Sequence, residues 1–101
     1  MSEFDAVRTL ANQEVDYAIK MIPSFADLFR KQTVDFERVG VQRKADFYLG
    51  AAWVTATNFF AFDFTKNFKR SPTMQENMII MQAVYTKLPE LRKAISDLGI
   101  E

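Results

Sequence analysis

An uncharged stretch runs from Phe47 to Phe62 and is bounded by Asp46 and Asp63. Six of its sixteen residues are aromatic, and no other part of the chain is as apolar over this length. As a helix it spans about 24 Å, which is short of the roughly 30 Å hydrocarbon core of a bilayer. Gly50 and several polar residues dilute it further. The stretch therefore predicts a helix that is buried inside a soluble protein and does not span a membrane.

Placing these residues at about 100° steps divides the apolar side chains between two opposite sides of the helix. A helix that is apolar on two sides cannot lie on a solvated surface, so both sides must be covered. The alternation over residues 60–64 also fits a short strand, but the helical context favours a helix. One side carries Leu49, Trp53, Ala56, Phe60 and Phe64, and the other carries Tyr48, Ala51, Val54, Phe59 and Phe62.

Two amphipathic segments precede this helix. The first is expected to begin after Ser2, a suitable N-cap, and to end at Ile22, because Pro23 follows and removes a backbone donor. The second is expected to run from Ser24 to Gly40, a natural C-terminal stop. The apolar stripe of the first contains Phe4, Val7, Ala11, Val15, Ala18 and Ile22, and that of the second contains Phe25, Leu28, Phe29, Phe36 and Val39.

The third helix is expected over residues 42–68, with two further helices after it. Thr73 followed by Glu76 predicts a capping box, and a stripe of methionines follows. Pro89 is expected to open a short last helix that ends at Gly99. The connections are short, which favours antiparallel neighbours. We therefore expect one all-α domain over residues 1–101: a small antiparallel bundle of four to five helices with a central, doubly apolar third helix.

The chain contains neither histidine nor cysteine. This excludes Ser–His and Cys–His nucleophile systems, histidine-ligated haem, thiolate zinc sites and iron–sulfur clusters. Three isolated glycines cannot make a phosphate-binding loop. We expect no catalytic residues, no metal and no cofactor, and we do not expect an enzyme. Aspartate, glutamate, lysine and tyrosine can still move protons, so an enzyme would need a cleft with a carboxylate of strongly raised pKa.

The spacing of the carboxylates in the sequence does not identify a residue whose pKa would be strongly raised. Residues on one helical face are three or four apart, whereas Glu14 and Asp16, like the other acidic pairs in the helices, are two apart. The exception is Asp97 with Glu101, at the end of the last predicted helix. The inward-facing pairs that a dimetal bundle needs are missing from this pattern.

Thirteen basic residues balance thirteen acidic ones, which does not favour a nucleic-acid partner. The first residues contain acidic side chains and no basic segment followed by an apolar run, so we do not expect a secretory signal. The lack of cysteine suits the cytoplasm, where we expect the protein to be.

Two amides lie among the apolar residues of the predicted helices, Gln32 in the second and Asn58 in the third. A buried amide needs hydrogen-bond partners, and we favour satisfied core amides over pocket groups for both. The Met74, Met78 and Met81 stripe fits ordinary core better than an adaptable binding surface.

The sequence favours a non-enzymatic helical module for protein–protein interaction, which we expect to be a homodimer. Four modest amphipathic helices can cover one side of the third helix fully and the other only partly. The alternative is a carrier for an apolar small molecule or lipid held within the bundle. A third possibility is a lipid surface into which exposed phenylalanines insert. The candidate interface or pocket residues are Gln32, Tyr48, Trp53, Asn58, Phe59, Phe60 and Phe62.

Overall fold

The computed structural model describes residues 3–100 and shows four packed helices within that range, with no strand among them. They are α1 (Glu3–Lys31), α2 (Lys44–Phe68), α3 (Met74–Thr86) and α4 (Leu88–Ser96). The expectation of an all-helical protein is confirmed. The predicted N-cap, Ser2, lies outside the described residues. None of the helices described is long and apolar enough to cross a membrane.

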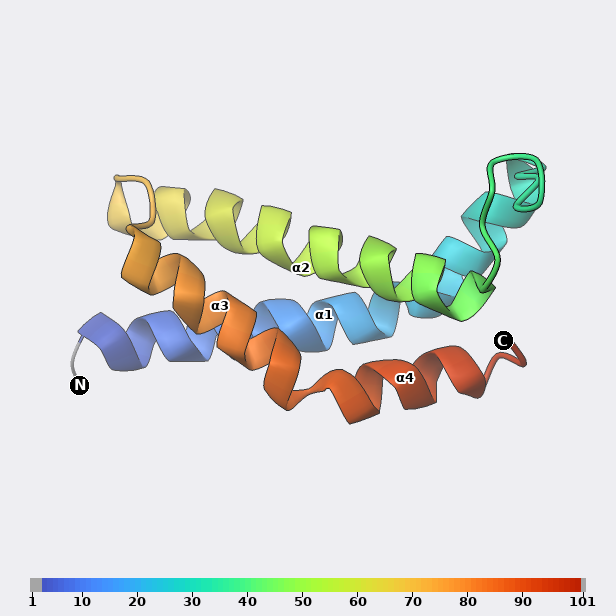
Figure 1. Ribbon diagram of the computed structural model, residues 1–101. Coiled ribbons are helices and arrows are strands. Elements are labelled where there is room, and N and C mark those ends of the chain that lie inside the picture. The colour runs from blue at the N-terminus through green and yellow to red at the C-terminus, as the bar shows by residue number, and fades with distance from the viewer. Residues whose placement is uncertain (1–2, 101) are drawn as a thin grey trace.

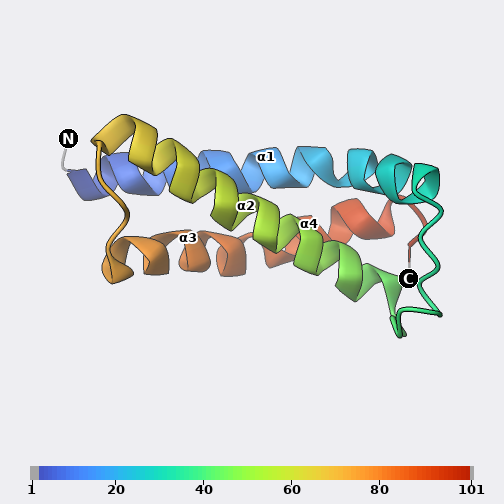
Figure 2. The same ribbon diagram turned by 90° about the horizontal axis from the view of Figure 1, so that it is seen from above.

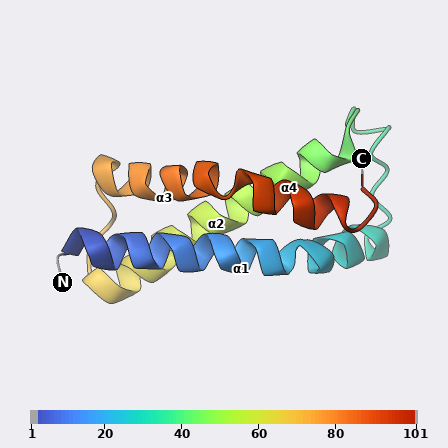
Figure 3. The ribbon, with the colours of Figure 1, turned by 90° about the horizontal axis from the view of Figure 1, so that it is seen from below.

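The molecule is elongated, with extents of 45 × 23 × 20 Å. α2 returns along α1, and α3 followed by α4 then runs back beside both (Figure 1). Seen from above, α2 crosses obliquely over the other helices (Figure 2). α4 begins two residues after the end of α3 and continues in the same general direction (Figure 3), so this connection does not reverse the chain as we expected of neighbouring helices.

The expected helix break at Pro23 is wrong, because α1 is one helix from Glu3 to Lys31. Pro23 is exposed, whereas Ile22 and Phe25 beside it are buried in the core. A proline inside a helix costs about 3 kcal/mol, which is comparable with the burial of two large apolar side chains at about 1.5–3 kcal/mol each. Packing on both sides of the proline therefore keeps the helix continuous.

The expected second helix, which we placed from Ser24 to Gly40, is also wrong in its second half. The helix ends at Lys31, where Thr33 adopts a left-handed conformation with φ of 53°. The amide of Thr33 donates to the carbonyl of Arg30, and the amide of Val34 donates to the carbonyl of Phe29. This pair of hydrogen bonds is a Schellman motif, which closes the helix well before the glycine that we expected to end it.

The connection over residues 32–43 is held to the bundle by aromatic contacts. Phe36 lies 6.2 Å from Phe29 of α1 and 5.2 Å from Phe47 of α2, ring centre to ring centre. Both contacts are edge-to-face, the geometry that aromatic quadrupoles favour. Gly40 takes a φ of 83° and ends a turn within this connection. An aromatic residue thus anchors a segment that is not helical.

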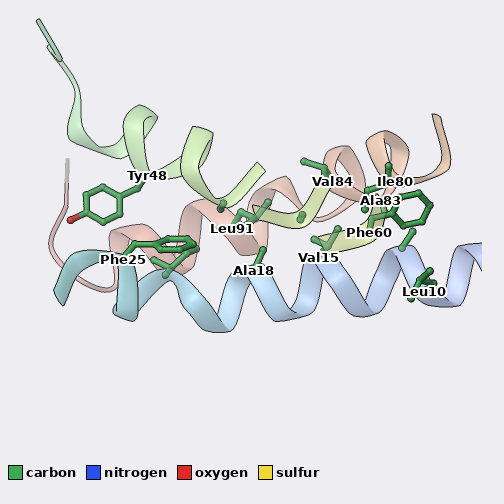
Figure 4. Packing of buried hydrophobic residues seen from close by; sticks show 14 of the residues in the cluster. Leu10, Val15, Ala18, Phe25, Tyr48, Phe60, Ile80, Ala83, Val84 and Leu91 are labelled. Atoms are coloured by element: carbon green, nitrogen blue, oxygen red, sulfur yellow. The ribbon is translucent and has the colours of Figure 1, made fainter. Parts of the chain in front are cut away.

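The core lies where α1 and α2 face each other, with α3 and α4 covering the remaining side (Figure 4). α2 contributes one buried residue in every turn, and α1 contributes an equally regular stripe. The buried residues of α2 are Tyr48, Ala52, Ala56, Phe60 and Phe64. Those of α1 include Val7, Ala11, Val15, Ala18 and Ile22.

The capping box at the start of α3 is confirmed. The amide of Glu76 donates to the Thr73 hydroxyl at 3.2 Å, and the amide of Thr73 donates to the Glu76 carboxylate at 2.9 Å. Glu76 is buried and also accepts two hydrogen bonds from Arg70, which in turn binds Glu3 of α1 at 2.6 Å. The Arg70 guanidinium and the backbone of Thr73 together lower the pKa of Glu76 from 4.5 to about 2.

Replacing Pro23 with alanine should stabilise the protein by about 2 kcal/mol, because alanine restores a helical hydrogen bond and tolerates the same conformation. Urea unfolding followed by circular dichroism measures this change. The neighbouring exposed Ser24→Ala serves as the control and should change stability by less than about 0.5 kcal/mol. An unchanged or lower stability of the Pro23 variant would contradict this account of α1.

Candidate functional site

The side of α2 that faces away from the other helices is exposed and carries no charge between residues 47 and 62. Phe62 is 66% exposed and Val54 is 56% exposed, which is unusual for large apolar side chains on one helix face. We call this surface the outer face of α2. It consists of Phe47, Gly50, Val54, Asn58, Ala61 and Phe62, all of them exposed.

The expectation that both sides of this helix are covered is not met within one chain. α1, α3 and α4 cover the inner side, and nothing in the described residues covers Val54 or Phe62. The two opposed apolar sides inferred from sequence are mixed in the fold, since Tyr48 and Phe60 are both buried although we placed them on different sides. The burial pattern follows the spiral of a long helix that crosses its neighbours obliquely.

The candidate residues divide into three groups. Tyr48 and Phe60 belong to the core. Trp53 is half-buried and packs edge-to-face on Tyr85 of α3, with ring centres 5.5 Å apart. The other four are exposed or on the rim of the outer face: Gln32, Asn58, Phe59 and Phe62.

Neither amide is where the sequence placed it. Gln32 is exposed in the turn after α1, because the helix that was to bury it ends one residue earlier. Asn58 is exposed on the outer face of α2 rather than packed in a core. The prediction of satisfied core amides is therefore wrong for both, and neither points into an interior pocket.

A hollow of about 300 Å³ lies beside the outer face, where α1 meets α2. Tyr17 of α1 packs edge-to-face on Phe59 of α2 with ring centres 5.3 Å apart. Phe62 belongs both to this hollow and to the outer face, so the two surfaces are continuous. The lining residues are Gln13, Glu14, Tyr17, Phe59, Phe62 and Asp63.

Two carboxyl groups meet in this hollow. Glu14 of α1 is only 7% exposed, and it shares a hydrogen bond with Asp63 of α2. Burial raises the pKa of Glu14 from 4.5 to about 7, and the hydrogen bond to Asp63 and the negative charge of Asp63 raise it as well. The Glu14 carboxyl beside Asp63 therefore gains or loses its proton near neutral pH.

Sequence reasoning missed this pair because it compared carboxylates only within one helix. A signal was present. Glu14 falls within the apolar stripe of α1, between Ala11 and Ala18, and Asp63 interrupts a run of phenylalanines. A carboxylate on the buried side of each of two helices indicates a shared partner, but only the fold shows that the two sides face each other.

Most of the charged groups near the pair form ion pairs with other residues. Asp16 of α1 binds Lys87, and the only acid of α3, Glu76, is bound by Arg70. Lys66 follows Asp63 by one turn on α2 and is exposed. Among the described residues no lysine or arginine forms an ion pair with Glu14 or Asp63.

The pair does not form a metal site. Within residues 3–100 no group of three or more histidine, cysteine, aspartate or glutamate side chains could hold a metal ion.

A larger surface hollow, of about 950 Å³, lies at the opposite end of α2 near Arg43 and Arg92. Asp46 lies 3.8 Å from Arg43 and 3.7 Å from Arg92, so the charge there is partly compensated.

No protein-family model, no curated protein and no solved structure matches the chain.

The carboxyl pair should make stability depend on pH. The pKa of Glu14 is raised in the folded state, so its contribution is full below about pH 4.5 and is lost as pH rises through about 7. We expect the free energy of unfolding to fall by about 2–3 kcal/mol between pH 5 and pH 8. The pKa of Glu76 is lowered to about 2, so stability also falls as pH drops from about 4.5 towards 2.

Urea unfolding at a series of pH values measures both changes in the free energy of unfolding: the fall above pH 5, and the fall on acidification below about pH 4.5, which we call the acid limb. Glu14→Gln keeps a hydrogen-bond donor for Asp63 and should flatten the profile above pH 5 while leaving the acid limb intact. Glu37→Gln, a change of one exposed carboxylate in the 32–43 connection, should leave both limbs as they are. A wild-type profile that is flat from pH 5 to 8 would refute the account of the pair.

Proposed function

We propose that this chain is a non-enzymatic helical interaction module that forms a homodimer through the outer face of α2. The single observation that carries the proposal is the exposure of large apolar side chains, above all Val54 and Phe62, on a face with no charge over sixteen residues. Buried aromatic residues dominate the binding energy of protein interfaces, and charges are depleted at their centres.

A second copy of the chain fits this face better than a charged partner does. In a two-fold symmetric dimer the same patch meets itself, so any charge on it would face a like charge. The outer face carries none between Phe47 and Phe62, and the chain as a whole has a formal net charge of zero. The surface therefore meets no electrostatic penalty against its own copy.

Gly50 supports a close approach at this face. A glycine inside a helix costs about 1 kcal/mol relative to alanine, so it needs a reason. No atom lies within 4 Å of the position that a Cβ would occupy at Gly50, and its backbone is ordinary helix. Packing within the chain therefore does not require the glycine, whereas a second helix close to the outer face would.

In this dimer α2 becomes the doubly covered, central helix that its sequence calls for. Its inner side packs on α1, α3 and α4 of its own chain, in an antiparallel bundle, and its outer side packs on the second copy. A cytoplasmic location is part of the proposal and rests on the lack of cysteine, which suits a reducing compartment.

A carrier for an apolar molecule is less well supported. It required Gln32 or Asn58 to point into an interior pocket, and both are exposed. The hollow beside α2 is at the lower end of ligand-site volumes and has two carboxyl groups in its wall. Native mass spectrometry of the purified protein would reveal a bound apolar molecule, and vesicle flotation would reveal insertion into lipid.

The raised pKa of Glu14 is the observation that favours a catalytic candidate, since a carboxyl that titrates near neutral pH can act as general acid or base. Two features count against it. The Glu14 side chain is almost completely buried, and its hydrogen-bond partner is a second carboxyl rather than a nucleophile. A structural or regulatory role explains the same pKa without a substrate.

The double variant Val54→Lys with Phe62→Lys should weaken the dimer at least about 100-fold, since it places charges at the centre of an apolar interface. Both side chains are more than half exposed, so each chain should keep its helical content. Sedimentation equilibrium measures the dissociation constant, and circular dichroism checks the fold.

The matched control is Met74→Lys with Met78→Lys on α3. These two side chains are 80% and 64% exposed, so the prediction that the methionine stripe belongs to the core is wrong for both. It adds the same charge to another helix and should leave the dimer intact. If only the α3 variant dissociated the dimer, the interface would lie on α3 and not on α2. A wild-type chain that remains a monomer at every concentration would refute the homodimer.

Gly50→Ala should act on folding and on assembly in opposite directions. Alanine is the better helix former by about 0.5–1 kcal/mol, so the isolated chain should become more stable. The added methyl group should weaken the dimer if two helices approach closely there. Urea unfolding at low concentration and sedimentation at high concentration separate the two effects. A dimer strengthened by the alanine would argue against close contact at this position.

A further inference from the structure

The hollow that contains Glu14 and Asp63 shares the Phe62 side chain with the outer face of α2. Phe59 stands at the boundary, since it lines the hollow and packs on Tyr17 of α1. A helix of a second copy that covers Phe62 therefore covers part of the wall of the hollow as well. The carboxyl pair belongs to the edge of the proposed interface rather than to a separate site.

Covering the hollow raises the free energy of the ionised forms of the two carboxyl groups in it. Glu14 is already 7% exposed, so the solvent contact of the pair is mainly that of Asp63, which is half-buried. A second copy that removes this contact takes solvation from both carboxyl groups. Desolvation disfavours the charged form, and two negative charges side by side disfavour it further.

The surroundings do not supply a compensating cation. Lys66 of α2 is exposed one turn away, Lys87 is bound to Asp16, and Arg70 is bound to Glu3 and Glu76. The charged side chains of α4 lie in other contacts, Arg92 with Asp46 and Lys93 with Asp97. A proton is therefore the positive charge that the pair can most readily take up.

We propose that dimer formation through the outer face of α2 is coupled to the uptake of one proton per chain by the Glu14–Asp63 pair. The inference rests on the proposed homodimer and adds its regulation. With one proton, Glu14 donates a hydrogen bond to Asp63 and the pair carries a single negative charge. Without it, two adjacent negative charges lie beneath the arriving copy and oppose assembly. The dimer is thus the acid-favoured state and the monomer the alkaline-favoured state.

Sedimentation equilibrium of the wild-type chain at pH 6.0 and pH 8.5 tests the coupling. Uptake of one proton by each of two chains predicts a dissociation constant at least about 10-fold higher at the alkaline pH. The same pair of measurements on Glu14→Gln should give a dimer of nearly equal strength at both, because glutamine keeps the donor and the pair then holds one charge at either pH. Asp63→Asn should weaken the pH dependence without abolishing it, because burial still raises the pKa of Glu14.

Glu37→Gln is the matched control, since it removes one exposed carboxylate far along the chain from the pair. It should retain the wild-type dependence on pH. Circular dichroism confirms that each variant is folded. If a variant does not fold, the wild-type series keeps the proposal falsifiable, because an equal dissociation constant at both pH values still overturns the coupling.

The outcomes separate the coupling from the homodimer. A wild-type dimer whose dissociation constant is the same at both pH values overturns the coupling and leaves the homodimer standing. A pH dependence that survives unchanged in Glu14→Gln also overturns it, because another group then takes up the proton. A monomer under all conditions overturns both proposals together.

Discussion

The packing of α1 against α2 is the constraint on which the rest of the molecule depends. α2 presents one buried side chain in every turn, from Tyr48 to Phe64, and α1 faces it with a regular, mainly apolar stripe in which the small residues Ala11 and Ala18 are fully buried. Small residues on one helix allow the large rings of the other, such as Phe60, to fill the space between them. α3 and α4 then have one remaining side to cover. The outer face of α2 is what this arrangement leaves exposed.

The same contact accounts for the carboxyl pair. Glu14 follows Ala11 by one turn on the side of α1 that meets α2, so the regular packing that buries the alanine also buries the acid. Asp63 follows the buried Phe60 by one turn in the same way on α2. Two acids are thus brought together by helices whose other contacts are apolar, and the low dielectric of those contacts is what raises the pKa of Glu14.

Local signals in the sequence predicted the elements whose causes are local. The capping box of Thr73 and Glu76 and the long uncharged helix both appear where they were expected. Predictions failed where tertiary contacts decided the outcome. Burial of Ile22 and Phe25 carries α1 through Pro23, and a left-handed Thr33, a residue without a strong preference for that conformation, ends the helix before Gln32 is buried. The acid pair could not be found without knowing which helix sides meet.

Arg70 joins parts of the chain that are far apart in sequence. Its guanidinium binds Glu3 at the start of α1 and Glu76 at the start of α3, and it lies 5.0 Å from the ring centre of Phe64 in α2. Three helices therefore share one side chain at this end of the molecule. Elements tied in this way open together rather than singly, so their amide hydrogens should exchange as one cooperative unit. The first turn of α1, although it is close to the chain terminus, should fray no more readily than the corner between α2 and α3.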